Sequence, residues 1–288
     1  MRILILGGDG MLGHRLLKDL SRSHDVRATL RMEAGAYTRF PLFNETNSYA
    51  GVDVRVTDRL ISVLADFHPE AVINAVGVVK QRPDGLDRIP NLEINALLPH
   101  RLAVICGAIG AHLIHISTDC VFSGRRGKYA ESDEPDPIDV YGHSKLLGEV
   151  VFPGCITLRT SIIGRELTRK TSLLEWFLAQ TGTVNGYRHA IFSGFTTIEM
   201  SHIMETLVTH FPASSGIYHV SSDPISKFDL LTMIKNKLEL PVEVRPEEEF
   251  RCDRSLDSTR FRRDFAYTPP TWGQMIDGLA VDFRERQQ

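Results

Sequence analysis

The stretch "GGDGMLG" (Gly7–Gly13) decides the fold, because it separates two segments of different periodicity. Before it, "RILIL" (2–6) is a short apolar run typical of a buried strand. After it, "MLGHRLLKDL" (11–20) carries apolar residues at helical spacing. The glycines therefore lie at a strand-to-helix turn, where the backbone can take positive φ or approach a ligand closely.

A helix N-terminus behind such a turn offers unpaired N–H groups and the positive end of a dipole, which suits a pyrophosphate. A plain tight turn packed against the helix explains the same glycines. The loop alone leaves both interpretations open.

The composition is that of an ordinary globular protein. The chain has 288 residues, 42% of them hydrophobic and 24% charged, with a formal net charge of −3, so it lacks the basic field that attracts nucleic acid or acidic lipid. No apolar run approaches the roughly 20 residues that cross a bilayer, and the first strand begins too early for a signal peptide. The four cysteines show no CxxC spacing and the histidines no ligand cluster. We expect free thiols, no metal site and a cytoplasmic location.

Strand-like and helix-like segments alternate over residues 1–165. Further strands are expected at 24–31, 52–56, 70–77, 111–118 and 155–161. The helices between them are expected at 58–67, 95–109 and 140–151. This alternation predicts an α/β fold, a Rossmann-type doubly wound parallel sheet that binds ligands beyond the carboxyl ends of its strands.

From residue 166 to 288 the rhythm changes. Helical patterns at 198–211, 226–238 and 271–283 flank strand patterns at 216–222 and 242–248. We expect residues 1–165 to form one domain and residues 166–288 a smaller α/β lobe, some of whose segments return to the first sheet. Loops 33–51 and 80–91 follow strand ends and are placed to cover a ligand.

Three side chains form a candidate catalytic group. "YGHSK" puts Tyr141 and Lys145 four residues apart at the start of a helix, hence on one face. The ammonium of Lys145 favours the phenolate and lowers the pKa of Tyr141, which makes it a proton donor or acceptor near neutral pH. Thr118 ends the fifth strand and is placed to hydrogen-bond a substrate carbonyl. Taken singly, a half-buried tyrosine beside a solvated lysine and a strand-end cap explain these residues equally well.

Four motifs together resemble the extended short-chain dehydrogenase/reductase superfamily, and within it the dTDP-4-dehydrorhamnose reductase group: "GGDGMLG", "NAVG" (74–77), "STDCVFSG" (117–124) and "YGHSK" (141–145). The segments from "STDCVFSG" to "YGHSKLLGE" and "LRTSIIG" match the group's central pattern. The resemblance implies an NADP-dependent reductase of a nucleotide-activated 4-keto (deoxy)sugar, acting in deoxysugar or surface polysaccharide biosynthesis. An epimerase that retains NAD and a non-catalytic regulatory subunit that keeps the fold stay open as alternatives.

The resemblance also implies domain and residue roles: residues 1–165 would form the NAD(P)-binding domain and residues 166–288 mainly a substrate-binding lobe. Tyr141 would protonate the ketone oxygen, Lys145 would bind the nicotinamide ribose, and Thr118 would hold the carbonyl oxygen. The cofactor would contact Gly7, Gly10, Met11, Leu12, Gly13, Asp58, Arg59, Ala75, Val76, Gly77 and Asn95, besides Tyr141 and Lys145. The substrate would contact Val79, Lys80, Thr118, Asp119 and Ile162.

The end of the second strand bears on cofactor choice. No acidic residue stands there to bind the ribose 2′-OH of NAD, whereas Arg31 can pair with a 2′-phosphate. We therefore expect NADP, with NAD open if Glu33 reaches the ribose instead.

Two departures from the family pattern concern the substrate. Cys120 stands where the related dehydratases carry a glutamate, which argues against dehydration. Ile162 stands where rhamnose-forming enzymes usually carry a tryptophan, so the identity of the sugar stays open. The expected partner is a nucleotide sugar, not nucleic acid or a membrane, and a homodimer is left open.

Overall fold

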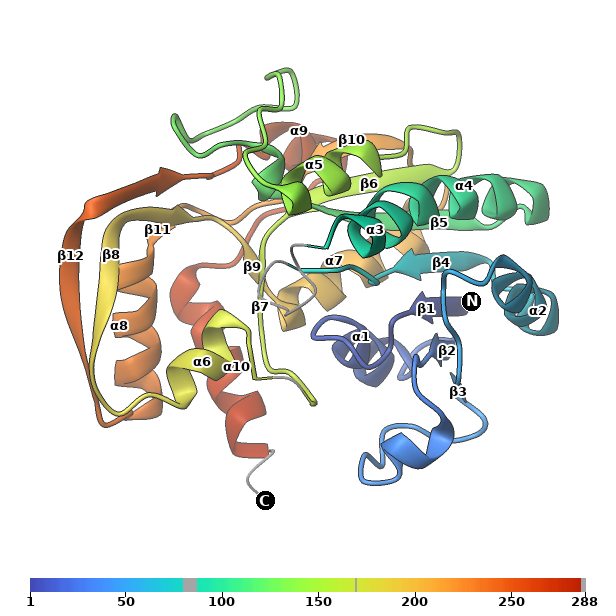
Figure 1. Cartoon of the computed structure of the whole chain (residues 1–288), viewed down its shortest axis with the longest axis horizontal. Coiled ribbons are helices and arrows are strands. Elements are labelled where there is room, and N and C mark those ends of the chain that lie inside the picture. Colours follow the sequence, from blue (N-terminus) through green and yellow to red (C-terminus); the bar gives the residue numbers. More distant parts are fainter. Residues whose placement is uncertain (80–86, 169, 286–288) are drawn as a thin grey trace. The chain divides into compact units, whose positions relative to one another are not determined.

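The computed structural model of the chain describes residues 1–79, 87–168 and 170–285 (Figure 1). Its contacts divide the chain into two compact units, which interleave along the sequence. Unit 1 comprises Met1–Ser117, Asp139–Leu158 and Ser201–Ile217, and unit 2 comprises Thr118–Ile138, Arg159–Met200 and Tyr218–Gln288. The division at residue 165 into a cofactor domain and a substrate lobe is a functional one and stays a prediction.

A seven-stranded sheet has the order β10-β6-β5-β4-β1-β2-β3. Its strands are β1 (Arg2–Leu6), β2 (Asp25–Thr29), β3 (Ser48–Tyr49), β4 (Ala71–Asn74), β5 (His112–Thr118), β6 (Cys155–Thr160) and β10 (Gly216–His219). Strand β1 pairs in parallel with β2 and β4, and β4 pairs in parallel with β5. The strand order runs outward from β1 in both directions, which creates a switch point between β1 and β4. The predicted Rossmann-type α/β fold is confirmed.

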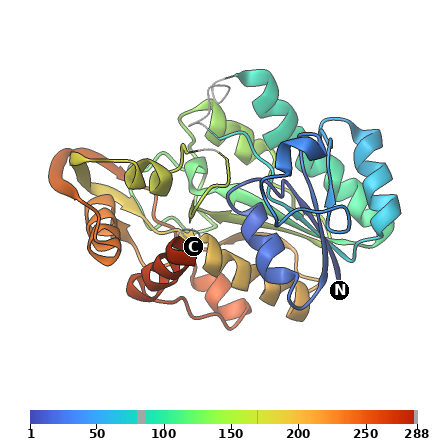
Figure 2. The same cartoon turned by 90° about the horizontal axis from the view of Figure 1, so that it is seen from below.

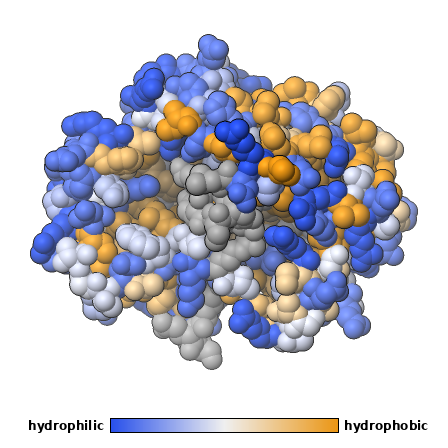
Figure 3. Space-filling model, viewed as in Figure 1, coloured by the Kyte–Doolittle hydropathy of each residue, from blue (hydrophilic) through white to orange (hydrophobic). Residues whose placement is uncertain are grey.

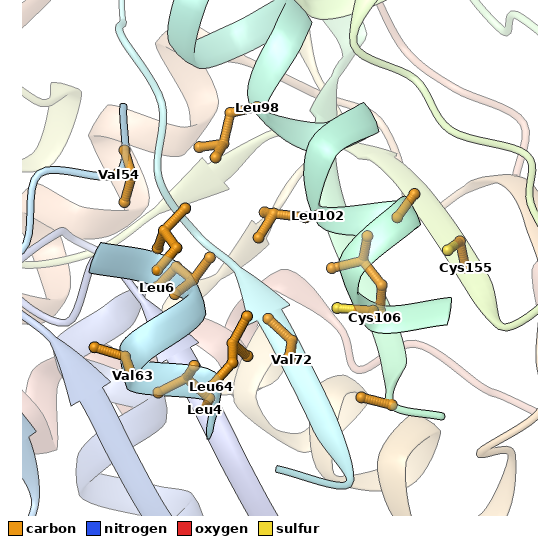
Figure 4. Packing of buried hydrophobic residues seen from close by; sticks show 14 of the residues in the cluster. Leu4, Leu6, Val54, Val63, Leu64, Val72, Leu98, Leu102, Cys106 and Cys155 are labelled. Carbon is orange, nitrogen blue, oxygen red and sulfur yellow. The ribbon is translucent and has the colours of Figure 1, made fainter. Parts of the chain in front are cut away.

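Helices cover the part of this sheet that lies in unit 1. They include α1 (Gly13–Leu20), α2 (Thr57–Phe67), α4 (Leu98–Ile109) and α5 (Val140–Leu147). Figure 2 shows α1 on one face of the sheet and α2 and α4 on the other. Leu4 and Leu6 of β1 pack with Leu98, Leu102 and Cys106 of α4 in one buried cluster (Figure 4). Burial on both faces explains why β1 is apolar without alternation.

The strand expected at 52–56 is wrong. Only Ser48 and Tyr49 pair with β2, and Val52 and Val54 pack into the buried cluster without joining the sheet. The side chain of Asp53 accepts hydrogen bonds from the backbone and the guanidinium of Arg55, which turns the chain toward α2. The alternation of valines therefore reflects packing under α2 and not strand pairing.

A continuous helix from Arg88 to Ile109 corrects the expectation that no apolar segment reaches membrane-spanning length. By length and composition alone this helix would qualify. It joins α3 (Arg88–Pro90), a π-helical segment η2 (Asn91–Leu97) and α4. Leu98, Leu102 and Cys106 within it belong to the buried cluster, as in the core helix of a folded domain. The side chains of Leu97 and Val104 in this helix are exposed. Figure 3 shows apolar residues on the surface in the region of this helix.

Unit 2 contains a three-stranded sheet of order β11-β8-β12. The strands are β8 (Gly182–Phe192), β11 (Ile225–Ser226) and β12 (Val242–Asp253), and helix α8 (Lys227–Leu238) packs against β8. A smaller sheet pairs β7 (Ile162–Ile163) with β9 (Phe195–Thr196). The remaining helices are α6 (Leu173–Leu178), α7 (Thr197–His210, which continues into unit 1), α9 (Thr259–Asp264) and α10 (Trp272–Glu285). The sequence interpretation missed β7, β8, β9, β11, α6 and α9.

Candidate active site

The glycine-rich loop joins β1 to α1 in a shape that demands glycine at two positions. Gly7 has a φ of +85°, and a Cβ on Gly13 would lie 2.0 Å from the carbonyl oxygen of Gly7. Thr29 holds the loop, because its hydroxyl and carbonyl oxygens accept the N–H groups of Gly7 and Gly8 at 3.2 and 2.9 Å. The first turn of α1 contains no acidic side chain, and none caps it. The start of α1 therefore presents no acidic side chain of its own that would compete with an external phosphate group.

The loop continues through Gly10, Met11 and Leu12. Gly10 donates its N–H to the Gly7 carbonyl at 3.0 Å, which closes a tight turn. Met11 is half-buried and Leu12 is buried. The predicted pyrophosphate cradle is thus a well-defined structure, and its contact with a cofactor stays a prediction.

The segment after β4 lies beside this loop. Ala75, Val76 and Gly77 are half-buried, and Val76 Cγ2 is 2.9 Å from the position of a Cβ on Gly7. The amide of Asn95 clamps the next residue: its Oδ1 accepts the N–H of Val78 at 2.9 Å, and its Nδ2 donates to the carbonyl of Val78 at 3.0 Å. Asn95 is fully buried. A position of this amide on the helix surface is therefore excluded.

Asn95 also links this segment to α5. Its Nδ2 is 3.1 Å from the hydroxyl of Ser144, and Ser144 is the residue before Lys145. A Cβ on Gly148 would lie 1.9 Å from the carbonyl oxygen of Asn95, so a glycine is needed where α5 ends against η2. The expected cofactor-lining residues 75–78 and helix α5 are therefore joined through one buried asparagine.

Helix α5 carries Tyr141 and Lys145 one turn apart. Asp139 caps its N-terminus by accepting the N–H of Gly142 at 2.7 Å. Tyr141 is half-buried, whereas Lys145 is 4% exposed and donates from Nζ to the carbonyl oxygen of Ile116 at 2.5 Å. Burial lowers the pKa of Lys145 to about 8, and the negative charge of Glu149 acts in the opposite direction. The solvated lysine that the sequence left open is therefore excluded.

Thr118 is the last residue of β5 and is 5% exposed. Its hydroxyl oxygen accepts the N–H of Cys120 at 3.1 Å and donates to the carboxylate of Asp119 at 3.2 Å. These bonds start a 3₁₀ turn, η3 (Asp119–Val121), which is the strand-end cap that the sequence left open for Thr118. The catalytic role of Thr118 stays a prediction.

The remaining predicted residues have varied surroundings. Arg31 follows β2 and is exposed, and Asp58 and Arg59 are exposed in the first turn of α2. Val79 is exposed, Ile162 is half-buried in β7, and Lys80 lies outside the described residues, as does most of the expected 80–91 loop.

Four residues near these groups were not singled out from the sequence. The carboxylate of Glu149 accepts the hydroxyl proton of Ser117 at 2.8 Å. The hydroxyl of Tyr37 donates to the carboxylate of Asp9 at 2.8 Å. Glu149 stands four residues after Lys145 and Asp9 stands between two glycines of the loop, so spacing could have pointed to these two. No sequence pattern marks Ser117 or Tyr37.

Comparison with known proteins agrees with this geometry. The family model described as RmlD substrate binding domain matches residues 1–184. The dTDP-4-dehydrorhamnose reductase of Aggregatibacter actinomycetemcomitans is 28% identical over 96% of this chain and 98% of its own. Methionine adenosyltransferase 2 subunit beta of Bos taurus is 26% identical over 83% of this chain and 73% of its own. The crystal structure of Bacillus anthracis dTDP-4-dehydrorhamnose reductase in complex with NADP superposes with a TM-score of 0.78 at 22% identity, covering 98% of this chain and 99% of that one.

The Rossmann-type sheet, the glycine-rich loop and the Tyr141–Lys145 pair define an oxidoreductase of the NAD(P)-dependent short-chain dehydrogenase/reductase type. Within that class, the chain belongs to the RmlD substrate-binding domain family and is similar to dTDP-4-dehydrorhamnose reductases along nearly its whole length.

Proposed function

We propose that the chain is an NADP-dependent reductase of a nucleotide-activated 4-keto sugar. The observation that carries this proposal is the pair on α5, where Tyr141 stands one turn before a buried Lys145 whose amino group contacts the carboxyl end of β5. The relative named dTDP-4-dehydrorhamnose reductase supports the substrate class. The NADP in the superposed crystal structure supports the cofactor.

The residues of unit 1 fit a dinucleotide. The close approach of Gly13 to Gly7 leaves no room for a side chain, and the first turn of α1 lacks an acid, both of which suit a pyrophosphate. Arg31 is exposed beyond the end of β2 and, among the described residues, makes no ion pair. Glu33, the alternative ribose ligand, lies against Gly51, with its Oε1 2.6 Å from the position of a Cβ on that glycine. These features support a 2′-phosphate at Arg31.

Each catalytic side chain has one task in this proposal. The bound cofactor supplies a hydride to the keto carbon. Tyr141 donates its hydroxyl proton to the ketone oxygen, so that the carbonyl becomes an alcohol. Lys145 binds the ribose and stabilises the phenolate that Tyr141 leaves behind. Thr118 donates a hydrogen bond to the same oxygen, and Asp119, Ile162 and Val79 contact the sugar.

The test is turnover with a panel of dTDP-, UDP- and GDP-linked 4-keto sugars, followed as NADPH oxidation. The Tyr141→Phe variant should lose about 10²–10⁴-fold in kcat, because general acid catalysis is lost, while NADPH binding changes little. Tyr49→Phe is the matched control, since the Tyr49 hydroxyl bonds Arg27 at 2.6 Å at the edge of the sheet. Near-normal kcat in Tyr141→Phe would overturn the assignment of Tyr141 as the proton donor.

The likeness to methionine adenosyltransferase 2 subunit beta favours a second candidate, a regulatory subunit that binds the dinucleotide without turnover. NADPH binding with no oxidation across the whole panel would favour it. Interconversion of sugars without net NADPH loss would favour an epimerase instead.

A further inference from the structure

The segment after β2 is held by a buried tyrosine that the proposed reaction does not use. Tyr37 ends a 3₁₀ turn, η1 (Ala34–Tyr37), and is 5% exposed. Its ring meets the edge of Phe43 with a centroid distance of 5.4 Å. Its hydroxyl donates to Asp9 Oδ2 at 2.8 Å and accepts the N–H of Met32 at 3.1 Å. One phenol therefore joins the glycine-rich loop to the residue that follows Arg31.

The backbone on both sides of Arg31 is fully bonded. Leu30 donates its N–H to Tyr49 at 2.8 Å and accepts from Val52 at 2.9 Å. Met32 donates its N–H to the Tyr37 hydroxyl oxygen at 3.1 Å, and its carbonyl accepts the N–H of Gly51 at 2.8 Å. Arg31 therefore lies on a strip of backbone that hydrogen bonds hold on both sides, and its own side chain is exposed. Among the hydrogen bonds described for this strip, the one to Tyr37 comes from a side chain, so it can be removed by substitution.

The negative charge of Asp53, near Arg31, is already paired with the guanidinium of Arg55. Asp53 makes contacts of 3.0 and 3.1 Å with Nε of Arg55, and this hydrogen bonding, more than the charge of Arg31, holds the pKa of Asp53 below its usual value. Because Arg55 already donates to the Asp53 carboxylate, the N–H groups of the Arg31 guanidinium can donate to a bound anion. Asp9 is engaged in the same way by Tyr37. The carboxylate of Asp9 therefore already accepts a hydrogen bond, so it is not an unpaired negative charge beside a bound phosphate.

We propose that Tyr37 is a positioning residue for cofactor choice, which holds Arg31 where it pairs with a ribose 2′-phosphate and holds Asp9 back from the phosphates. This inference rests on the NADP assignment in the proposed function. When the backbone at Arg31 is fixed, its guanidinium loses less conformational entropy on binding a phosphate, so losing the phenol hydroxyl weakens recognition of the 2′-phosphate specifically. Tyr37 acts through Arg31 and Asp9 and does not itself contact the cofactor.

The experiment measures calorimetric Kd values of the full chain for 2′,5′-ADP and 5′-AMP, which differ only in the 2′-phosphate. The preference is the ratio of the two. Arg31→Ala should reduce the preference roughly ten- to a hundredfold, and Tyr37→Phe roughly three- to tenfold, with 5′-AMP binding kept within about twofold. Tyr49→Phe is the matched control and should leave the ratio unchanged. Adding Tyr37→Phe to Arg31→Ala should cause no further loss of preference, because the first acts through the second.

Asp9→Ala removes the other partner of the phenol and gives a second, independent variant. It should lower the preference less than Tyr37→Phe, because Tyr37 still holds Met32. An equal weakening of both fragments in Tyr37→Phe, or an unchanged ratio while Arg31→Ala lowers it, would overturn the role of Tyr37 and leave the proposed function standing. A wild-type chain with no preference for 2′,5′-ADP would overturn the NADP assignment itself and the inference with it.

Discussion

Among the described residues, each unit buries one lysine or arginine to the same extent: Lys145 in unit 1 and Arg159 in unit 2 are both 4% exposed. Lys145 donates to a single backbone carbonyl, that of Ile116, and burial brings its pKa down to about 8. Arg159 donates to Nε2 of His219 at 3.2 Å and lies over the ring of Phe122 at 5.3 Å. Equal burial thus has different chemical consequences.

The difference follows from the two side chains. An ammonium can lose its proton when burial penalises the charge, so Lys145 titrates near neutral pH, where a proton is useful to catalysis. A guanidinium keeps its charge, so its neighbour must adapt. Burial, which is the larger cause, and the charge of Arg159 lower the pKa of His219 to about 4. His219 stays neutral and donates from Nδ1 to the carbonyl of Tyr129 at 2.9 Å, which closes a structural network.

The largest effect is expected from Lys145→Met, which removes the titrating cation and keeps the length of the side chain. Turnover should fall about 10²–10⁴-fold, while the melting temperature stays level or rises, because a buried charge is no longer desolvated. Lys237→Met is the control, since Lys237 is an exposed lysine paired with Asp277. Activity within tenfold of wild type would contradict a catalytic role for Lys145.

The corresponding change in unit 2 should affect stability. His219→Leu removes the acceptor that faces the buried guanidinium and the donor to Tyr129, and should lower the free energy of unfolding by about 3–5 kcal/mol. Urea denaturation measures it, with the exposed His143→Leu as control. A loss below about 1 kcal/mol would mean that His219 does not balance Arg159.

Lys145 and His219, the neighbour of Arg159, should change the stability of the protein in separate pH ranges. The pKa of His219 falls from 6.5 when unfolded to about 4 when folded, so the unfolded chain binds more protons between these values. The contribution of His219 is complete above pH 6.5 and is lost as pH falls toward 4, by about 3 kcal/mol. The pKa of Lys145 falls from 10.5 to about 8, so stability recovers a similar amount as pH rises from 8 to 10.5.

Measuring the free energy of unfolding across both windows checks these signs. His219→Gln should remove part of the pH dependence in the acid window only, because burial also lowers the pKa values of His112 and His115. Lys145→Met should remove the contribution of Lys145 in the alkaline window only. A single variant that flattens both windows would show that the two networks are coupled.

The smallest effect concerns Glu149, whose charge raises the pKa of Lys145. Glu149→Gln should therefore move the alkaline limb of the kcat–pH profile to lower pH, by less than about one unit. Ser117→Ala, which removes the 2.8 Å hydrogen bond to Glu149 but leaves its charge in place, should shift the limb by less than Glu149→Gln does. A shift toward higher pH would contradict this link.

The predictions from the sequence succeeded where the signal was local. The glycine spacing, the strand at 2–6 and the helix carrying Tyr141 and Lys145 depend on neighbours within a few residues, and all three are present. The strand at 52–56 failed because alternating valines packed under a helix have the same pattern as a paired strand. Strand β8 was missed because its polar residues, from Thr183 to His189, obscure its alternation.

The sequence by itself determined the class of fold, most of the strand and helix alternation over residues 1–165, and the motifs proposed to carry the chemistry, because periodicity and motif spacing act along the chain. The tertiary structure alone decided that Lys145 is buried against Ile116, that Asn95 clamps Val78, and that Tyr37 reaches Asp9. Each of these contacts joins residues 17 or more positions apart. Burial and hydrogen bonding between such residues depend on how strands and helices pack, which no local pattern encodes.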